Sequence, residues 1–358
     1  MIPAAYAILD LDAVQHNLAV VRHYAPDAKV MAVIKANGYG HGLLRIAEAL
    51  QGVDAYAVAR VDEGIRLRNA GFANRIVVLE GFTYADELDA FMNYQLDTVV
   101  HSSVQLELLD KRHENNQITV WLKLDTGMNR LGFKVRELDS VYQRLSACSV
   151  IKPSIHLMTH LASADDKNDA MTLRQIRLFD EAVAKYPGQR SIANSAGILG
   201  WPAALAEWVR PGVMLYGISP FPELVGSQLD LKPVMSLHSR LIAVKPIEKG
   251  DTVGYGGSWR CEKSTLLGVV AIGYGDGYPR YASPGTPVFV NGKRVPLIGR
   301  VSMDMITVDL ETQPLAKPGD PVILWGEHLP VEEIAHCAGT IPYTLVCGIT
   351  QRVQIVCD

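Results

Sequence analysis

The stretch Met31-Ala32-Val33-Ile34-Lys35-Ala36-Asn37-Gly38-Tyr39-Gly40-His41-Gly42 joins an apolar run to a lysine and a glycine-rich turn. The apolar run predicts a buried strand, and Lys35 follows it directly. Barrel enzymes place their active sites at such strand ends, where desolvation lowers the pKa of a lysine amine and makes covalent or proton-transfer chemistry feasible near neutral pH. The alternative is a solvent-exposed lysine beside an ordinary turn, and this stretch alone gives both equal weight.

The same alternation of strand and helix continues from residue 29 to about residue 213. Helical stretches such as 43–50 and 173–183 have apolar residues at the spacing of one helix face, for example Leu173, Ile176, Phe179 and Val183. Eight such units predict a (β/α)8 barrel of the TIM type, although a doubly wound open sheet would produce the same local pattern. The expected strands are 30–34, 55–59, 76–79, 98–100, 118–124, 154–159, 191–193 and 208–210.

The composition changes after about residue 230, where Val, Ile, Thr, Gly and Pro become frequent. Asn291-Gly292 is typical of a β-hairpin turn, and 331–338 is the one stretch in this part that looks helical. We therefore predict a barrel domain in residues 1–230 and a mainly β-strand domain in residues 231–358. The strands expected in the second domain include 266–272, 287–290, 305–310 and 322–324.

Charge and composition favour a small-molecule enzyme. The chain has 358 residues, with 34 basic against 38 acidic residues and no basic run, which argues against a nucleic-acid surface. No apolar window is long enough to span a membrane, and the N-terminal residues do not resemble a secretory signal, so a cytoplasmic location is expected. Five scattered cysteines without CxxC spacing predict neither disulfides nor a metal site.

Two loops near the end of the predicted barrel have the character of a phosphate site. Arg-Pro-Gly-Val at 210–213 follows the eighth strand, and Ala-Asn-Ser-Ala-Gly at 193–197 follows the seventh. Phosphate sites in barrels commonly lie at these two places, where backbone N–H groups of Gly212 and Val213 and the Ser195 hydroxyl would be available. Each loop alone is equally an ordinary cap or turn. Together with the strand-end lysine they favour a phosphorylated, lysine-linked cofactor.

Other strand ends add polar groups whose ordinary roles are structural. Arg130 ends the segment that follows the fifth strand, and His160 ends the sixth strand. A lone histidine is more often a structural hydrogen-bonding group than a catalyst, and Arg130 could form a surface ion pair. Tyr255 and Tyr274 stand among glycines, where hairpin turns with half-buried aromatic rings are the simplest interpretation.

Taken together, these segments resemble the alanine racemase family, which are fold-type III enzymes that use pyridoxal 5′-phosphate (PLP). The match runs in order through nearly the whole chain, in segments 32–42, 123–128, 210–212, 254–256, 273–277 and 299–304. The resemblance implies a (β/α)8 barrel followed by a β domain, in agreement with the pattern described above. It also implies interconversion of L-alanine and D-alanine.

The resemblance implies that Lys35 carries PLP covalently and that Arg210 faces the pyridine nitrogen. A guanidinium has no practical proton to give, so the nitrogen stays unprotonated and the ring is a weaker electron sink, which favours reprotonation over transamination. The positions that match the family's phosphate contacts are Tyr39, Ser195, Gly212, Val213 and Tyr343, with Asn194 adjacent.

Racemisation removes a proton from one face of Cα and delivers one to the other, so two bases must flank the bound amino acid. The resemblance assigns the D-alanine face to Lys35 and the L-alanine face to Tyr255. A free phenol has a pKa of about 10, and His160, hydrogen-bonded toward Arg210, matches the position that assists the tyrosine.

Further matches concern the substrate and the assembly. Arg130 and Met303 match substrate-binding positions, and Lys123 matches a lysine that is carbamylated in some members. The family tyrosine enters from the partner subunit, so the resemblance implies a homodimer with two shared sites, to which Met303 and Asp304 also contribute. The positions that match the access corridor are Asp165, Tyr274, Arg280 and Arg300. Together with Tyr343, this corridor would limit the substrate side chain to about a methyl group.

Three other classes of protein are considered. A PLP-binding regulatory protein would typically be a bare barrel without the β domain that carries Tyr255. A decarboxylase of this fold type would need Glu where this chain has Arg210. A racemase of other or broader specificity, for example for serine, stays open, as does the choice between D-alanine supply for peptidoglycan and L-alanine catabolism.

Overall fold

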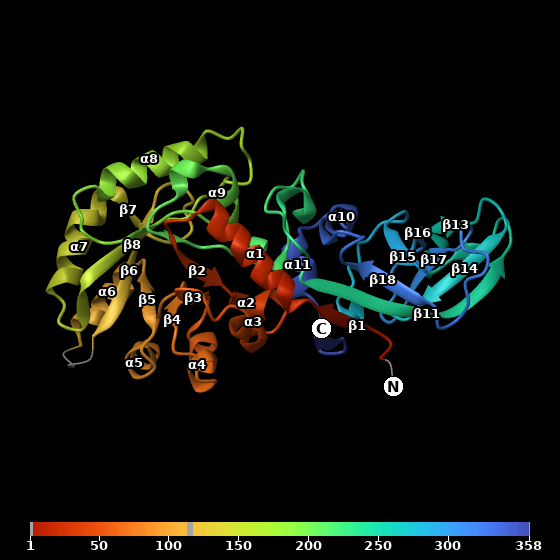
Figure 1. Ribbon diagram of the computed structural model, residues 1–358, viewed down its shortest axis with the longest axis horizontal. Coiled ribbons are helices and arrows are strands. Elements are labelled where there is room, and N and C mark those ends of the chain that lie inside the picture. Colours follow the sequence, from red (N-terminus) through yellow and green to blue (C-terminus); the bar gives the residue numbers. More distant parts are fainter. Residues whose placement is uncertain (1–2, 113–116, 358) are drawn as a thin grey trace. The chain divides into compact units, whose positions relative to one another are not determined.

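The computed structural model describes residues 3–112 and 117–357. The chain divides by its contacts into two compact units, one formed by Asn17–Leu215 and one formed by Met1–His16 together with Tyr216–Asp358 (Figure 1). The sequence predicts domains at 1–230 and 231–358, so the contact division differs in assigning the first residues to the C-terminal unit. Below, the two units are called the barrel unit and the β unit.

Eight parallel strands close into a barrel in the first unit. Both ends of the strand order are joined, because β5 pairs with β6 and β10 pairs with β2. A doubly wound sheet would leave two open edges, so this closure confirms the predicted (β/α)8 barrel and excludes the alternative. The barrel strands are β2 (Lys29–Val33), β3 (Ala55–Val58), β4 (Arg75–Val78), β5 (Asp97–Val100), β6 (Ile118–Asp125), β8 (Ile151–Met158), β9 (Arg190–Ser191) and β10 (Trp208–Val209).

Helices follow the strands and lie outside them, as Figure 1 shows for α4 to α8. Their apolar sides cover the strands, which are buried on both faces as expected for a parallel barrel. No helix in the described part of the chain is long and apolar enough to cross a bilayer. The helices here are α1 (Leu11–Tyr24), α2 (Lys35–Tyr39), α3 (Leu43–Ala49), α4 (Val61–Asn69), α5 (Ala85–Asn93), α6 (Ser103–Asp110), α7 (Leu138–Ala147), α8 (Met171–Val183) and α9 (Ser195–Gly200).

One prediction about α8 is wrong in its detail. Leu173, expected on the buried face, is 41% exposed, whereas Thr172 and Gln175 are completely buried. The helix is therefore rotated so that a polar position faces inward, and Ile176 still packs against the barrel. The hydrogen bonds of Gln175, described below, account for this rotation.

The β unit contains an eight-stranded sheet in the order β14-β17-β16-β15-β18-β11-β1-β19, and β11 also pairs with β14. Asn291-Gly292 joins β15 to β16 with φ angles of 47° and 79°, which confirms the predicted hairpin because two positive φ angles define a type I′ turn. The elements are β1 (Tyr6–Leu9), β11 (Met235–Ile247), β12 (Thr252–Val253), β13 (Trp259–Arg260), β14 (Thr265–Val270), β15 (Pro287–Val290), β16 (Lys293–Ile298), β17 (Ile306–Asp309), β18 (Pro321–Trp325), β19 (Gln354–Cys357), α10 (Val331–Cys337) and α11 (Pro342–Cys347).

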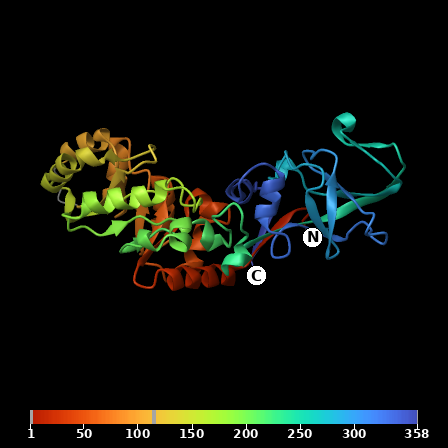
Figure 2. The same cartoon turned by 90° about the horizontal axis from the view of Figure 1, so that it is seen from above.

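Two elements of the β unit are not expected from the sequence. Strand β1 pairs antiparallel with β11 and parallel with β19, so the two ends of the chain lie in one sheet (Figure 2). Helix α11 begins with Pro342 at its first position, where the missing N–H of proline costs no hydrogen bond. The expected helix at 331–338 is confirmed as α10.

The amino-terminal ends of the barrel strands enclose an aromatic and ionic cluster. Arg75 donates to Asp97 across 2.8 Å, and the ring of Trp121 packs edge-on against Trp208 with centroids 5.6 Å apart. The His156 ring lies 4.6 Å from Trp121, centroid to centroid. These side chains fill the end of the barrel opposite to the face where the strands end, so their role is to stabilise the fold.

His156 is buried in this cluster in its neutral form. Burial, assisted by the positive charges of Arg75 and Lys29, lowers the pKa of His156 from 6.5 to about 4. Its Nδ1 atom has no hydrogen-bond partner among the described residues. Unfolding exposes the ring to water. Between pH 6.5 and 4, His156 is therefore protonated in the unfolded chain and neutral in the folded chain.

We expect His156→Gln to reduce the acid sensitivity of the protein. His156 contributes stability that is present above pH 6.5 and is lost as the pH falls toward 4, with a slope of at most about 1.4 kcal/mol per pH unit. The variant should therefore have a shallower dependence of the free energy of unfolding on pH in this window, measured by urea denaturation with tryptophan fluorescence. His23→Gln, at an exposed position, is the control. Equal slopes in both variants would contradict the assignment.

Candidate active site

The carboxyl ends of the barrel strands gather the polar residues that the sequence singles out. Lys35 follows β2, Lys123 lies near the end of β6, His160 follows β8 and Arg210 follows β10. Parallel strands in a closed barrel end on one face, so these side chains share one mouth. Their proximity is seen at Lys123 and His160, where burial and then the positive charges of the neighbouring cations lower the pKa of each group.

A left-handed turn follows Lys35, so the segment labelled α2 is not an ordinary right-handed helix. Ala36, Asn37 and Tyr39 have φ angles of 52°, 56° and 50°, and Gly38 between them has 63°. This conformation costs an ordinary L-residue about 1–2 kcal/mol, so a run of it persists only where surrounding contacts fix it. The backbone N–H of Leu43 donates to Asn37 Oδ1 across 3.1 Å, which ties the turn to the start of α3.

His41 closes the same turn from inside. The ring is completely buried, and its Nδ1 lies 2.8 Å from the carbonyl oxygen of Tyr39 and 3.1 Å from that of Gly38. Because carbonyl groups only accept, Nδ1 carries the proton. Burial lowers the pKa of His41 to about 4, so the ring is neutral and acts as a fixed donor to the turn.

Tyr39, Ser195 and Gly212 converge from three loops of the barrel mouth, and Tyr39 stands four residues after Lys35 in the chain. Ser195 Oγ accepts the backbone N–H of Gly212 across 2.9 Å, and it lies 3.4 Å from that of Met214. A Cβ atom added to Gly212 would lie 2.6 Å from the Tyr39 hydroxyl oxygen, so only glycine allows this approach. Val213, the next residue, is buried in the same loop. The result is a cluster of hydroxyl and backbone N–H groups on neighbouring loops.

Asn194 supports this cluster rather than joining it. Its Oδ1 accepts the backbone N–H of Gly197 across 2.9 Å and so caps α9, which begins at Ser195. Asparagine is a favoured residue for this task because its side chain satisfies an N–H group left free at a helix start. The cap holds Ser195 in place.

Arg210 is a buried cation held by neutral acceptors. Its guanidinium donates to Ser191 Oγ across 2.6 Å and to the carbonyl oxygens of Thr159 and Ile192 across 2.6 and 3.0 Å. No ion pair with a carboxylate is found for it in residues 3–112 and 117–357. Burial lowers the pKa of Arg210 to about 10, which leaves it charged at neutral pH.

His160 lies next to this guanidinium, as the sequence predicts. Arg210 Nη2 is 3.4 Å from His160 Nδ1, and a guanidinium only donates, so Nδ1 is the acceptor and Nε2 carries the proton. Burial, followed by the charge of Arg210, lowers the pKa of His160 well below 6.5. The imidazole is therefore neutral in the pH range in which most enzymes work.

Lys123 has an unusually low pKa for a lysine side chain. Burial, followed by the positive charges of Arg210 and Arg130, lowers its pKa from 10.5 to about 7. About half of such amines are neutral at pH 7, which makes Lys123 a nucleophile under conditions in which surface lysines are not.

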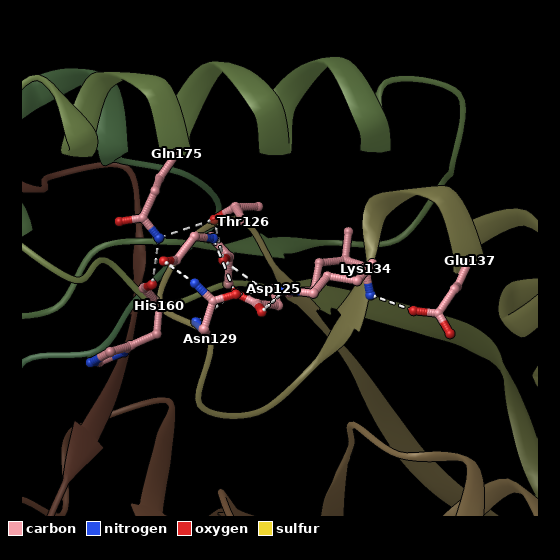
Figure 3. Close-up of polar contacts among 10 residues, drawn as sticks. Asp125, Thr126, Asn129, Lys134, Glu137, His160 and Gln175 are labelled. Carbon is pink, nitrogen blue, oxygen red and sulfur yellow. Dashed lines mark hydrogen bonds and ion pairs between the residues drawn. The ribbon is translucent and has the colours of Figure 1, made fainter.

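The loop that carries Arg130 is fixed by Asp125 (Figure 3). Asp125 Oδ1 accepts the backbone N–H groups of Gly127 and Asn129, both across 3.0 Å. Lys134 Nζ donates to Asp125 Oδ2 across 2.6 Å. Burial opposes ionisation of this carboxyl, but the hydrogen bonds from Lys134 and the two amides lower the pKa of Asp125 below its usual value. The loop between β6 and β7 (Phe133–Lys134) is thus held from within.

Gln175 was missed by the sequence reasoning. Figure 3 shows its side chain between two loops of the barrel mouth, where its Nε2 donates to Thr126 Oγ1 across 3.2 Å and to the His160 carbonyl oxygen across 3.0 Å. Its Oε1 accepts the backbone N–H of Ala162 across 2.9 Å. The sequence did contain one indication of this role: Gln175 stands on the apolar face of the predicted amphipathic helix, next to Ile176.

His101 was also missed. It follows β5, and its Nε2 lies 2.9 Å from the carbonyl oxygen of Glu80 at the end of the preceding unit. Burial is the main cause that lowers its pKa. Asp165, in contrast, was expected in the corridor and lies in an exposed turn after β8.

The remaining predicted residues belong to the β unit, where the loop 299–304 carries Arg300 and Met303 and contacts Tyr274. The backbone N–H of Gly275 donates to Met303 O across 2.8 Å, and the N–H of Tyr274 donates to Ser302 O across 3.0 Å. The guanidinium of Arg280 lies 6.0 Å from the centre of the Tyr274 ring.

Tyr255 and Tyr343 complete the set. Tyr255 lies in the turn between β12 and β13, which confirms the expected hairpin, but the expectation of a half-buried ring is wrong because Tyr255 is 69% exposed. A Cβ atom on the neighbouring Gly256 would lie 3.5 Å from Arg300 Nη1, so this turn is adjacent to the 299–304 loop. Tyr343 lies on α11.

Comparison with known families identifies both parts of the chain. The model described as "Alanine racemase, N-terminal domain" matches residues 9–220, and the model described as "Alanine racemase, C-terminal domain" matches residues 234–357. The chain is 50% identical over 358 residues to an alanine racemase of Shewanella sediminis, with 100% of both chains covered. It is 49% identical over 357 residues to an alanine racemase of Coxiella burnetii, with 98% of both covered.

Solved structures agree. The biosynthetic alanine racemase from Pseudomonas aeruginosa superposes with a TM-score of 0.97 at 41% identity, and alanine racemase from Acinetobacter baumannii superposes with a TM-score of 0.94 at 37% identity, with 100% of the chains covered in each comparison. With both domains matched and relatives at half identity over the full length, the chain belongs to the alanine racemase family.

Proposed function

We propose that this protein is a PLP-dependent alanine racemase that interconverts L-alanine and D-alanine by a two-base mechanism. The observation that carries the proposal is the cluster of Tyr39, Ser195 and Gly212, formed by loops at the same barrel mouth at which Lys35 follows β2. A reactive amine next to a phosphate-type cradle is what a lysine-linked phosphorylated cofactor requires.

The residues present fit PLP. Because Gly212 has no side chain, its loop approaches the Tyr39 hydroxyl closely, and the Ser195 hydroxyl, which accepts the Gly212 N–H, lies in the same cluster. The nearby cations suit an anionic group as well. We propose phosphate contacts from Tyr39, Ser195, Gly212, Val213 and Tyr343, supported by the Asn194 cap, a covalent link at Lys35, and Arg210 at the pyridine nitrogen. PLP, when bound, supplies the conjugated ring that takes up the electron pair released from the Cα–H bond.

Arg210 would act without moving a proton. Its guanidinium is fixed by Ser191 Oγ and two backbone carbonyl oxygens, and it remains charged at neutral pH. A guanidinium placed at the pyridine nitrogen would keep its proton and leave that nitrogen unprotonated, so the ring would attract electrons less strongly than one paired with a carboxyl group. This property favours racemisation over transamination.

Two bases would exchange the Cα proton. The Lys35 amine is assigned to the D-alanine face and Tyr255 of the partner subunit to the L-alanine face. The hydrogen bond between Arg210 and His160 supplies a positively polarised imidazole that would favour the ionised form of a phenol hydrogen-bonded to it. The 69% exposure of Tyr255 supports its use by a second copy in a homodimer with two shared sites.

Substrate recognition rests on charge and size. Arg130, on the loop fixed by Asp125, and Met303 are proposed to bind the alanine carboxylate region. The corridor residues Asp165, Tyr274, Arg280 and Arg300, with Tyr343, would limit the side chain to about a methyl group. Met303 is 53% exposed in the single chain, which fits a contribution to the partner's site.

The metabolic setting is part of the proposal. The relative from Pseudomonas aeruginosa is described as biosynthetic. We propose that this chain supplies D-alanine for peptidoglycan, with L-alanine catabolism as the alternative. No disulfide is formed by the five cysteines in the part of the chain that the structure describes, which fits a reducing compartment such as the cytoplasm.

Lys35→Ala is expected to abolish both covalent retention of PLP and racemisation, because the variant lacks the amine after β2 that would form the covalent link and serve as one of the two bases. The test adds L-alanine to the PLP-supplemented protein in D₂O and follows optical rotation and the α-proton NMR signal together. Wild type should lose both signals. Lys249→Ala, at an exposed position, should behave as wild type. A wild-type protein that changes neither signal would contradict alanine as substrate, and serine, lysine and arginine would be tested next.

The variant Tyr255→Phe distinguishes proton exchange on the L-alanine face of Cα from exchange on the D-alanine face. The variant keeps the Lys35 base, so D-alanine should still exchange its α-proton with D₂O while keeping its configuration. Exchange from L-alanine, and racemisation in both directions, should fall by about 10²- to 10⁴-fold, the usual contribution of one general base. Tyr281→Phe, at a position that is 84% exposed, is the control. An unchanged rate of exchange from L-alanine would remove Tyr255 from the mechanism.

Lys123 is proposed to be carbamylated. Its neutral amine would attack CO₂, forming an N–C bond and releasing one proton to water, so that a negative group replaces a positive one beside Arg130. With a pKa of about 7, the neutral amine becomes the major form between pH 6 and 8. A ¹³C carbamate signal should therefore increase over this range when the protein is supplied with ¹³C-bicarbonate, and Lys123→Met should lack it. Absence of the signal at pH 8 would show that Lys123 stays an amine.

A further inference from the structure

The carboxylate of Glu63 accepts hydrogen bonds from two separate segments. Glu63 lies on α4, is 8% exposed, and its Oε2 accepts the backbone N–H groups of Ala59 and Arg60 across 2.9 and 3.4 Å. These bonds satisfy N–H groups at the start of its own helix. Its other oxygen, Oε1, accepts the backbone N–H of Asn37 across 3.2 Å. Asn37 belongs to the left-handed turn after Lys35.

The next two barrel helices show what the helix start itself requires. In α5, Glu87 Oε2 accepts the backbone N–H groups of Thr83 and Tyr84. In α6, Gln105 Oε1 accepts those of His101 and Ser102. One oxygen is sufficient in both, and a glutamine serves as well as a glutamate. The second acceptor of Glu63 is therefore not needed to begin α4.

The second oxygen, Oε1, instead accepts the backbone N–H of Asn37, in the left-handed turn after Lys35. Asn37 has a φ of 56° and stands two residues after Lys35, between Ala36 and Gly38, which are also left-handed. A carboxylate is a stronger acceptor for a backbone N–H than a neutral group is. It fixes the peptide plane of Asn37, and through Ala36 it limits the directions in which the Lys35 side chain can leave the backbone.

We propose that Glu63 is a positioning residue for Lys35, and that its Oε1 holds the left-handed turn so that the lysine amine is presented in one orientation. The proposal rests on the function proposed above. It differs from a role in helix capping, which the other oxygen fulfils.

The variant Glu63→Gln distinguishes capping of α4 from the contact with Asn37. The amide oxygen can keep the contacts at the start of α4, as Gln105 does in α6, but the amide nitrogen is a donor and cannot accept the Asn37 N–H. Glu87→Gln is the matched control, because Glu87 occupies the equivalent helix position and accepts from its own helix start. Both variants are purified as the PLP-loaded protein.

Three measurements are compared. Amide hydrogen exchange by mass spectrometry should become at least tenfold faster for Glu63→Gln in the peptide 34–43, and the affinity for PLP should fall about tenfold, because a charged hydrogen bond is lost. The kcat for racemisation should fall about tenfold with little change in the KM for alanine. Glu87→Gln should match wild type in all three, while the thermal midpoints of the two variants should be similar.

Equal behaviour of Glu63→Gln and Glu87→Gln would overturn the proposal and leave Glu63 as a helix cap. A second comparison adds Ala36→Gly to Glu63→Gln. Glycine adopts the left-handed conformation without steric cost, so the double variant should recover at least threefold of the lost PLP affinity, and no recovery would argue against an effect through the turn. Glu63→Asp, one methylene too short to reach both segments, replaces Glu63→Gln if that variant does not fold.

The two proposals fail in different ways. If wild type neither retains PLP nor racemises alanine, the proposed function is wrong. The hydrogen-exchange comparison still reports whether Glu63 holds the turn, because this measurement does not depend on activity.

Discussion

Closure of eight parallel strands into one ring determines where every strand-end side chain lies. The pairing of β10 with β2 brings the first and last units of the barrel together, and so brings Arg210 to the same mouth as Lys35. Positive charge accumulates there and adds to the effect of burial, which is the main cause of the lowered pKa of Lys123. Cations placed so close together repel one another, and an anionic ligand relieves that repulsion. The same closure that stabilises the fold therefore creates a preference for phosphate and carboxylate groups.

Hydrogen bonds to uncharged groups, rather than ion pairs, hold Arg210 beside His160 at this mouth in the described part of the chain. Arg210 is fixed by hydroxyl and carbonyl oxygens, and His160 is kept neutral beside it by burial. Around them, Gln175 and Asp125 fix the loops from inside (Figure 3). Such an arrangement costs conformational freedom at folding, and in return the charged groups need little rearrangement when a ligand binds.

Local patterns predicted much of the fold. Each of the eight barrel strands and the hairpin at Asn291-Gly292 has a short-range signature, because burial on both faces and positive φ angles restrict the residues allowed. Strand β1 has no such signature, since its partners lie more than two hundred residues away in β11 and β19. The candidate site was predicted at strand ends and from family motifs. Gln175 and Glu63 were missed because their roles depend on which distant loop faces them.

The position of β1 between β11 and β19 has a consequence for synthesis of the chain. The sheet of the β unit needs residues near both ends, so a growing chain cannot complete it until β19 leaves the ribosome, about 345 residues after β1. At typical translation rates this is a delay of roughly 20 to 70 s. The barrel, made of consecutive units, has all its strands available much earlier. During that interval β1 can pair with β11 once that strand has been made, but the edge that β19 later covers stays open to other chains.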